Sequence, residues 1–159
     1  MTNSSHIEFR KIEPRDEDRL ARFFDSVITH DLNKLFHPHP FTCELAYEIS
    51  HYSGLDWYGG GFFCSLDSEE LIAYGILRGW DSGYQIPSLG ICVLPDFQRM
   101  GIGSVLMNIM ILISKLRNSP AIRLKVYPEN IDAINLYRSL GFEFCEELEA
   151  GLYVSYLKL

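Results

Sequence analysis

The feature that most constrains the fold is a pair of glycines, Gly101 and Gly103, between two apolar segments. Residues 86–94 carry apolar side chains at alternate positions and are followed by Pro95, which predicts a strand that ends there. Residues 103–116 are apolar at helical spacing and predict a helix. The glycines therefore form a turn from a strand into a helix N-terminus, where unpaired backbone N–H groups can bind a ligand.

Such a turn suits a ligand that contains phosphate, because a helix N-terminus carries about half a positive charge. Arg99 adds a full positive charge at the same place. The segment is neither a phosphate loop of the GK[ST] kind nor a full GxGxxG, which disfavours nucleotide triphosphates and dinucleotides. The alternative interpretation is a turn that needs its glycines for backbone geometry alone.

The remaining sequence predicts a single mixed α/β domain over residues 1–159, since no repeat or linker interrupts it. The order of elements is β-α-α-β-β-β-α-β-α-β-β, with meanders first and strand–helix–strand crossovers later. The run Gly59-Gly-Gly61 is interpreted as a break before a strand. The predicted strands are 7–12, 62–66, 71–77, 86–94, 121–126, 142–147 and 152–157, and the helices are one from Pro14 to before residue 37, then 42–52, 103–116 and 130–140.

The charge balance disfavours nucleic acid and membranes as partners. The chain has 14 Lys and Arg against 21 Asp and Glu, a net charge of −7, whereas a binder of these polyanions shows a basic face. The longest nearly apolar run, residues 105–113, is far shorter than the roughly 20 residues of a membrane helix. The first residues lack the basic start and apolar core of a signal peptide, so we expect a cytoplasmic protein.

The chain contains four widely spaced cysteines, Cys43, Cys64, Cys92 and Cys145. We expect all four to be reduced core residues. A role for Cys92 as a covalent acyl carrier is disfavoured by its predicted position in a buried strand. His37 and His39 with Cys43 lack a fourth ligand at suitable spacing, so no metal site is expected.

Two linked segments carry a family resemblance. Residues 91–103 read Ile-Cys-Val-Leu-Pro-Asp-Phe-Gln-Arg-Met-Gly-Ile-Gly, and residues 130–142 read Asn-Ile-Asp-Ala-Ile-Asn-Leu-Tyr-Arg-Ser-Leu-Gly-Phe. The first resembles motif A of the GNAT superfamily of acyl-CoA-dependent N-acetyltransferases, Q/R-x-x-G-x-G/A after a strand. The second is similar to the family's N-x-x-A-x-x-L-Y-x-x-x-G-F helix at every position. The resemblance implies a GNAT fold with a central mixed, mostly antiparallel sheet and acetyl-CoA as acyl donor.

The resemblance also implies roles for individual residues. The main chain of Ile91, Cys92 and Val93 would hold the pantetheine arm in a gap between two splayed strands. Asn130 would hydrogen-bond the cofactor arm and Tyr137 would be the general acid; residues seven apart share one helix face, so both can face the cofactor. The alternative for Tyr137 is a ring that simply packs on the sheet. The pyrophosphate would be held by the amides of Gln98, Arg99, Met100, Gly101, Ile102 and Gly103 and by the Ser104 hydroxyl.

The general base is less constrained, because residues 86–94 contain no acid, where family members often carry a Glu. The ribosomal-protein N-terminal branch carries a Glu five residues before the Asn, and this chain has Lys125 there. The candidates are His37, His39, Glu44 and Asp81. We expect His39, in the rigid proline-rich segment 37–42, to be the catalytic base, because a histidine accepts protons near neutral pH. The alternative is a stiff, solvent-facing connection.

These features predict direct acetyl transfer to a small amine acceptor such as an amino sugar or a polyamine. The acidic composition slightly favours a cationic acceptor. The alternatives are a protein N-acetyltransferase and a noncatalytic acyl-CoA-binding regulatory module. A homodimer through the terminal strands is compatible with the sequence.

Overall fold

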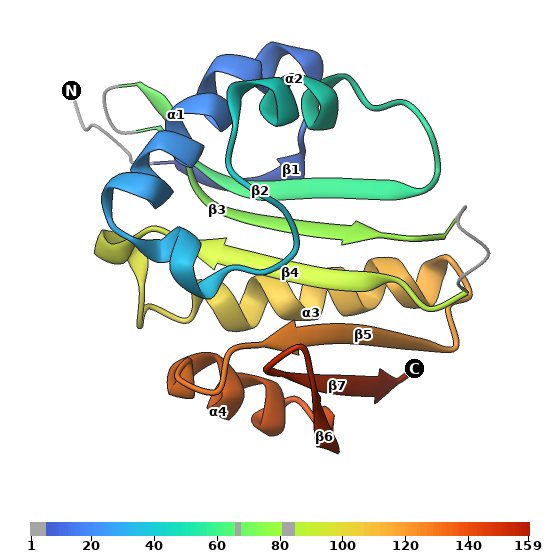
Figure 1. Ribbon diagram of the computed structural model, residues 1–159. Helices are drawn as coiled ribbons and strands as arrows, with labels where there is room; N and C mark the ends of the chain where they lie inside the picture. The colour runs from blue at the N-terminus through green and yellow to red at the C-terminus, as the bar shows by residue number, and fades with distance from the viewer. Residues whose placement is uncertain (1–5, 66–67, 81–84) are drawn as a thin grey trace.

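A seven-stranded sheet forms the centre of the molecule (Figure 1). The computed structural model describes residues 6–65, 68–80 and 85–159. The sheet order is β1-β2-β3-β4-β5-β7-β6, and among the strands of these described residues only the β4–β5 pair is parallel. The strands are β1 His6–Lys11, β2 Trp57–Ser65, β3 Glu69–Arg78, β4 Ser88–Val93, β5 Ala121–Val126, β6 Glu143–Glu149 and β7 Leu152–Lys158.

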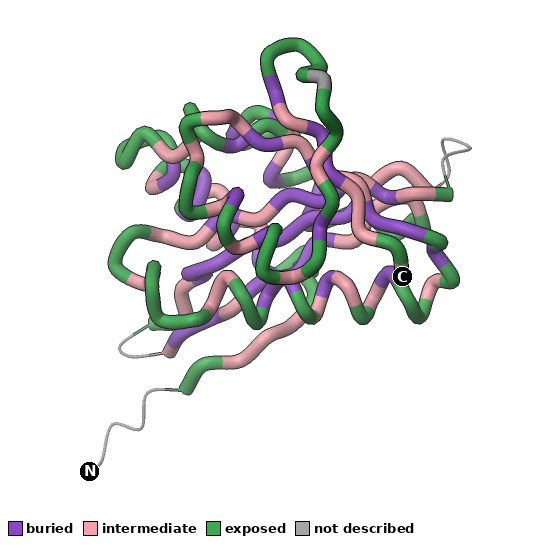
Figure 2. Tube along the Cα trace, turned by 90° about the horizontal axis from the view of Figure 1, so that it is seen from below, coloured by how far each residue is buried: buried purple, intermediate pink, exposed green. Residues whose placement is uncertain are grey.

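Within the described residues, four α-helices cover the two faces of this sheet. The helices α1 (Glu17–Thr29) and α2 (Cys43–His51) share one core cluster, and α3 (Ile102–Leu116) and α4 (Ile131–Ser139) contribute to the other. Strand β3 divides its side chains between the clusters, with Tyr74 on the α1 face and Ala73 on the α3 face. Figure 2 shows the buried positions concentrated in the strands between the more exposed outer turns.

The predicted order of elements is confirmed, and the predicted bounds of α2, α3 and α4 agree with the structure within one residue. The first helix, predicted from Pro14, begins later because Pro14–Asp16 form the short helix η1, and it ends at Thr29. Thr42 caps α2 by accepting a hydrogen bond from Leu45 N at 3.2 Å. The prediction of a break at the triple glycine is wrong. These glycines lie inside β2, buried and paired with β1 and β3. A Cβ at Gly61 would overlap Leu71 and the Ala73 carbonyl, so glycine is required by close packing.

The prediction of four core cysteines is wrong for two of them. Cys64 and Cys92 are buried, whereas Cys43 and Cys145 are exposed because they lie at a helix start and on the edge strand β6. The candidate base Asp81 lies outside the described residues. None of the helices in the described part of the chain is long and apolar enough to cross a membrane.

The chain between α1 and α2 crosses β4 at close range. It contains the short helix η2 (Leu32–Leu35) and continues over Gly90, where a Cβ would overlap Pro38 and approach the Phe36 ring to 3.1 Å. Glycine at this position lets the proline-rich segment lie directly on the strand.

His39 in this segment is enclosed by aromatic rings. It is only 8% exposed, and the rings of Phe24, Phe36, Phe41 and Tyr74 lie between 5.0 and 5.7 Å from its own. The Pro40 carbonyl accepts from Nδ1 at 2.7 Å, which leaves Nε2 to accept from the Tyr74 hydroxyl at 3.0 Å. His39 therefore joins the segment to the core as a neutral imidazole.

This arrangement predicts a pH-dependent stability. Burial lowers the pKa of His39 from 6.5 to about 4, so below pH 6.5 the unfolded chain binds a proton that the folded chain does not. The free energy of unfolding should fall between pH 6.5 and pH 4, with His39 contributing up to about 3 kcal/mol of the loss. Urea denaturation across this range gives the free energy of unfolding of wild type and of His39→Gln at each pH. The difference between the two proteins in the slope of this free energy against pH measures the contribution of His39. Parallel slopes would contradict it.

Candidate active site

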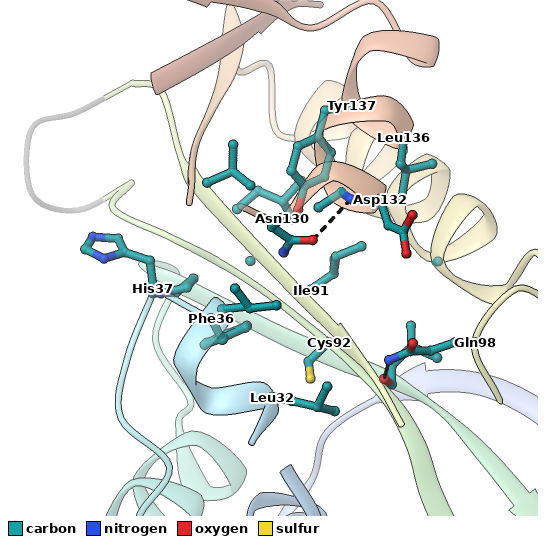
Figure 3. Close-up of a pocket in the computed structure, with 18 of the residues that line it drawn as sticks. Leu32, Phe36, His37, Ile91, Cys92, Gln98, Asn130, Asp132, Leu136 and Tyr137 are labelled. Carbon is teal, nitrogen blue, oxygen red and sulfur yellow. Dashed lines mark hydrogen bonds between the residues drawn. The ribbon is translucent and has the colours of Figure 1, made fainter. Parts of the chain in front are cut away.

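The strands β4 and β5 diverge after a single register pair, Ser88 with Arg123. The Arg123 amide donates to the Pro87 carbonyl at 2.9 Å at the start of the pair. Beyond this point a cavity of about 460 Å³ opens between the strands. Residues of both faces line it, with Tyr137 and Leu136 on one side of β4 and Phe36 and Leu32 on the other (Figure 3). The cavity therefore passes through the sheet.

The open edge of β4 carries backbone groups without a strand partner. The Leu94 amide donates to the Ile72 carbonyl of β3 at 3.0 Å. Because alternate residues direct their backbone groups to the same neighbour, Cys92 also faces β3, whereas Ile91 and Val93 face the gap. The Val93 carbonyl accepts from Gln98 Nε2 at 2.9 Å, which leaves the Ile91 N–H, the Ile91 carbonyl and the Val93 N–H for a ligand.

This alternation argues against the expectation that the Cys92 main chain holds the pantetheine arm, because the backbone groups of Cys92 face β3. Its contribution to the cavity is the thiol, which points toward Leu32 on the α1 face (Figure 3). Burial raises the pKa of this thiol to about 12, so it stays protonated and is a poor nucleophile.

One end of the cavity, here called the glycine end, is formed by the turn into α3. Gly101 is the N-cap, with φ of 84°, and the Val105 amide donates to its carbonyl at 3.1 Å. The preceding N–H groups of the first turn have no partner within the helix. Arg99 adds a positive charge and pairs at 3.5 Å with Asp132. The predicted residues that line this end are Gln98, Arg99, Gly101, Gly103 and Ser104; Met100 and Ile102 do not line it.

Helix α4 directs Asn130 and Tyr137 toward the same space beside Ile91 (Figure 3). Asn130 caps the helix by accepting from the Ala133 amide at 3.3 Å, so its amide nitrogen remains for a ligand. Tyr137 is 8% exposed, and within the described residues nothing hydrogen-bonds its hydroxyl. Burial raises the pKa of Tyr137 well above 10, so the phenol is protonated at neutral pH.

The opposite end, here called the lysine end, combines apolar and basic groups. Its lining residues are Leu32, Leu35, Phe36, His37, Pro38 and Lys125. Partial burial lowers the pKa of the His37 ring, and the positive charges of Lys125, Arg78 and Arg123 lower it further. Among the lining residues that the structure describes, Asp132 is the sole carboxylate, and it lies at the glycine end.

The placement of His39 argues against the predicted base. His39 lies outside this cavity with both ring nitrogens hydrogen-bonded, and its low pKa leaves little capacity to accept a proton. The neighbouring His37 lines the cavity instead. Glu44 is exposed on α2 and is not among the described lining residues.

Sequence reasoning missed the apolar residues of the lysine end. No sequence motif marks Leu32, Leu35 and Phe36 as lining residues. Their position follows from the fit of Pro38 over Gly90. The available signal was the pair of prolines, which marked the segment as rigid. The sequence singled out Lys125 only because a branch of the family carries a Glu at that position.

Comparison with known proteins identifies the family to which this fold and cavity belong. Residues 27–142 match the model of the acetyltransferase (GNAT) family. An N-alpha-acetyltransferase of Sulfurisphaera tokodaii is 29% identical over 150 residues, which cover 86% of this chain and 87% of that protein.

Two solved structures show the same fold. The GNAT domain of S. lividans PAT superposes with a TM-score of 0.79 at 18% identity, covering 96% of this chain and 90% of that one. The PaiA N-acetyltransferase of Thermoplasma acidophilum, solved in complex with coenzyme A, superposes with a TM-score of 0.78 at 20% identity, covering 97% and 99%. With the family model covering residues 27–142, the chain belongs to the acetyltransferase (GNAT) family and is an acyl-CoA-dependent acetyltransferase.

Proposed function

We propose that the protein transfers the acetyl group of acetyl-CoA directly to an α-amino group inside the cavity between β4 and β5. The observation that carries this proposal is the divergence of the two strands after Ser88 and Arg123. It leaves an unpaired strand edge that leads from a helix N-terminus to Tyr137. These are the groups that a long, amide-containing, phosphorylated acyl donor requires.

The acyl donor fits the cavity in one direction. Its pyrophosphate binds at the glycine end, where unpaired amides and Arg99 offset the net charge of −7. Its pantetheine amides pair with the backbone groups of Ile91 and Val93, as an added strand would. The thioester then lies close to Tyr137, and the lysine end remains for the acceptor.

Tyr137 supplies a proton to the leaving group. The neutral acceptor amine attacks the thioester carbon, and its nitrogen releases a proton to solvent. The carbon–sulfur bond breaks, and the thiolate takes the phenolic proton, which solvent then restores. A phenol with a raised pKa is a weak acid, but burial raises the pKa of a thiol in the same cavity as well, as Cys92 shows. The departing thiolate is therefore basic enough to draw a proton or a strong hydrogen bond from Tyr137.

The lysine end supports an α-amine as the acceptor. Deprotonation of an alkylamine with a pKa of about 10.4 costs roughly 4–5 kcal/mol of free energy at pH 7. Deprotonation of an α-amine with a pKa near 7.7–8.0 costs only about 1 kcal/mol. The described lining of this end contains no carboxylate to act as a base, and its cations lower the pKa of His37. The same charges lower the pKa of an approaching α-amine and repel a polyamine.

A protein N-terminus is the α-amine with independent support. The relative from Sulfurisphaera tokodaii is named an N-alpha-acetyltransferase, and the likeness extends over 86% of this chain. A small acceptor of the polyamine kind has no such support, and the basic charges of the lysine end oppose it.

Replacing Tyr137 tests the role of the general acid. Tyr137→Phe keeps the ring that packs on Phe142 and removes the hydroxyl, so we expect kcat to fall by about 10²- to 10⁴-fold while the Kd for coenzyme A changes by less than about twofold. Thiol release and calorimetry measure the two quantities. Tyr153→Phe, on β7 and outside the cavity lining, is the matched control. Wild-type turnover by Tyr137→Phe would remove Tyr137 from the reaction.

The choice of acceptor is tested with peptides of one sequence. One peptide has a free N-terminus and no lysine, and the other has a blocked N-terminus and one internal lysine. We expect the free α-amine to be acetylated with a kcat/KM at least about tenfold higher at pH 7, because its deprotonation costs less. Mass spectrometry locates the acetyl group. Preferential acetylation of the lysine, or of spermidine in a parallel assay, would contradict an α-amine acceptor.

A further inference from the structure

Two basic side chains of β5 converge on a single carboxylate beside the lysine end. Lys125 Nζ donates to Glu149 Oε1 at 2.5 Å, and Arg123 Nη2 donates to Glu149 Oε2 at 2.6 Å. Strand alternation directs Lys125 and Arg123 to the face opposite the core residues Ile122 and Leu124. That is the face on which the segment 36–38 lies over β4.

The positive charge at this place exceeds the negative charge. The positive charge of Arg78 also lowers the pKa of the His37 ring. The Arg78 guanidinium donates a hydrogen bond to the Pro38 carbonyl, which is neutral. Two of these cations thus share one carboxylate and the third has a neutral partner, in a chain whose net charge is −7. A local excess of this sign favours a ligand that carries negative charge.

The two β5 cations are largely withdrawn from solvent and have donors to spare. The Lys125 and Arg123 side chains are 16% and 25% exposed, whereas Glu149 is 55% exposed. Arg123 uses Nε on the Tyr156 hydroxyl and Nη2 on Glu149, which leaves Nη1. Lys125 uses one of its three N–H groups on Glu149. A second carboxylate can be bound without breaking either contact, and charge-assisted hydrogen bonds of this kind are strong.

We propose that the acceptor carries a carboxylate a few bonds from its α-amino group, and that Lys125 and Arg123 bind this carboxylate and so determine acceptor specificity. The inference rests on the proposed function, because the amine must reach the thioester through the lysine end. The carboxylate belongs either to a free amino acid or to an acidic residue at a peptide N-terminus, and both present the same chemistry.

Glu149 then acts as an internal competitor, because its negative charge offsets the positive charge of Lys125 and Arg123. It stands at the end of β6, where Ala150 and Gly151 turn the chain with φ of 53° and 80° into β7. A purely structural role, in which Glu149 ties the β6–β7 hairpin to β5, makes a different prediction. Loss of a structural tie would impair every acceptor alike, whereas loss of a competitor favours acidic acceptors.

Two isosteric acceptor pairs test the proposal. Asp-Ala-Ala-amide against Asn-Ala-Ala-amide varies a side-chain carboxylate on a peptide, and alanine against alaninamide varies the carboxylate of a free amino acid. We expect kcat/KM to favour the acidic member of at least one pair by about tenfold or more, as a charge-assisted hydrogen bond provides. The pair that discriminates identifies the source of the carboxylate.

Variants of Lys125 and Glu149 distinguish recognition of the acceptor carboxylate from a purely structural role. Lys125→Met should reduce the preference to within about twofold, because the methionine keeps the volume and removes the charge. Glu149→Gln should increase the preference, because it removes the negative charge that offsets Lys125 and Arg123. Lys115→Met, on the exposed side of α3, is the matched control and should leave the ratio unchanged.

The outcomes separate this inference from the proposed function. Equal turnover of both members of both pairs, or a preference that survives Lys125→Met, would overturn carboxylate recognition while leaving α-amine acetylation intact. A lower acidic preference in Glu149→Gln would overturn the competitor role of Glu149 and with it the two-cation site. Acetylation of alkylamines but of no α-amine would overturn both proposals.

Discussion

The divergence of β4 from β5 is the feature on which the rest of the site depends. A parallel pair that ends after Ser88 and Arg123 leaves the Ile91 and Val93 amides at an inner edge of the sheet rather than at its rim. Unpaired backbone groups at such depth are costly unless a ligand or water satisfies them. The fold therefore maintains an incomplete sheet, and an extended ligand with amide groups completes it.

The two helices and the segment around this gap give its ends different chemistry. Helix α3, with Gly101 as its N-cap, offers positive partial charge to phosphate, and α4 directs Asn130 and Tyr137 over the middle. On the other face, the fit of Pro38 over Gly90 holds an apolar wall beside Lys125. An anionic donor and an amine acceptor can thus approach one point from opposite faces of the same sheet.

Much of this arrangement was predictable from local sequence. The glycine turn, the cap at Asn130 and the spacing to Tyr137 depend on residues close together in the chain, and the structure has each in the expected element. The triple glycine and His39 were misinterpreted for a common reason. Gly61 and His39 are determined by what packs on them from distant segments, Leu71 in one case and Tyr74 in the other. The convergence of Lys125 with Glu149 likewise depends on how strands distant in sequence lie together in the sheet.

Amide hydrogen exchange of the β4 backbone with and without coenzyme A tests the central claim most directly. The account predicts that the Ile91 and Val93 amides exchange readily in the free protein and become protected when coenzyme A binds. The Cys92 amide, already paired with β3, should be protected in both states. Protection of Ile91 and Val93 before the ligand is added, or exchange at these two amides that coenzyme A leaves unchanged, would contradict it.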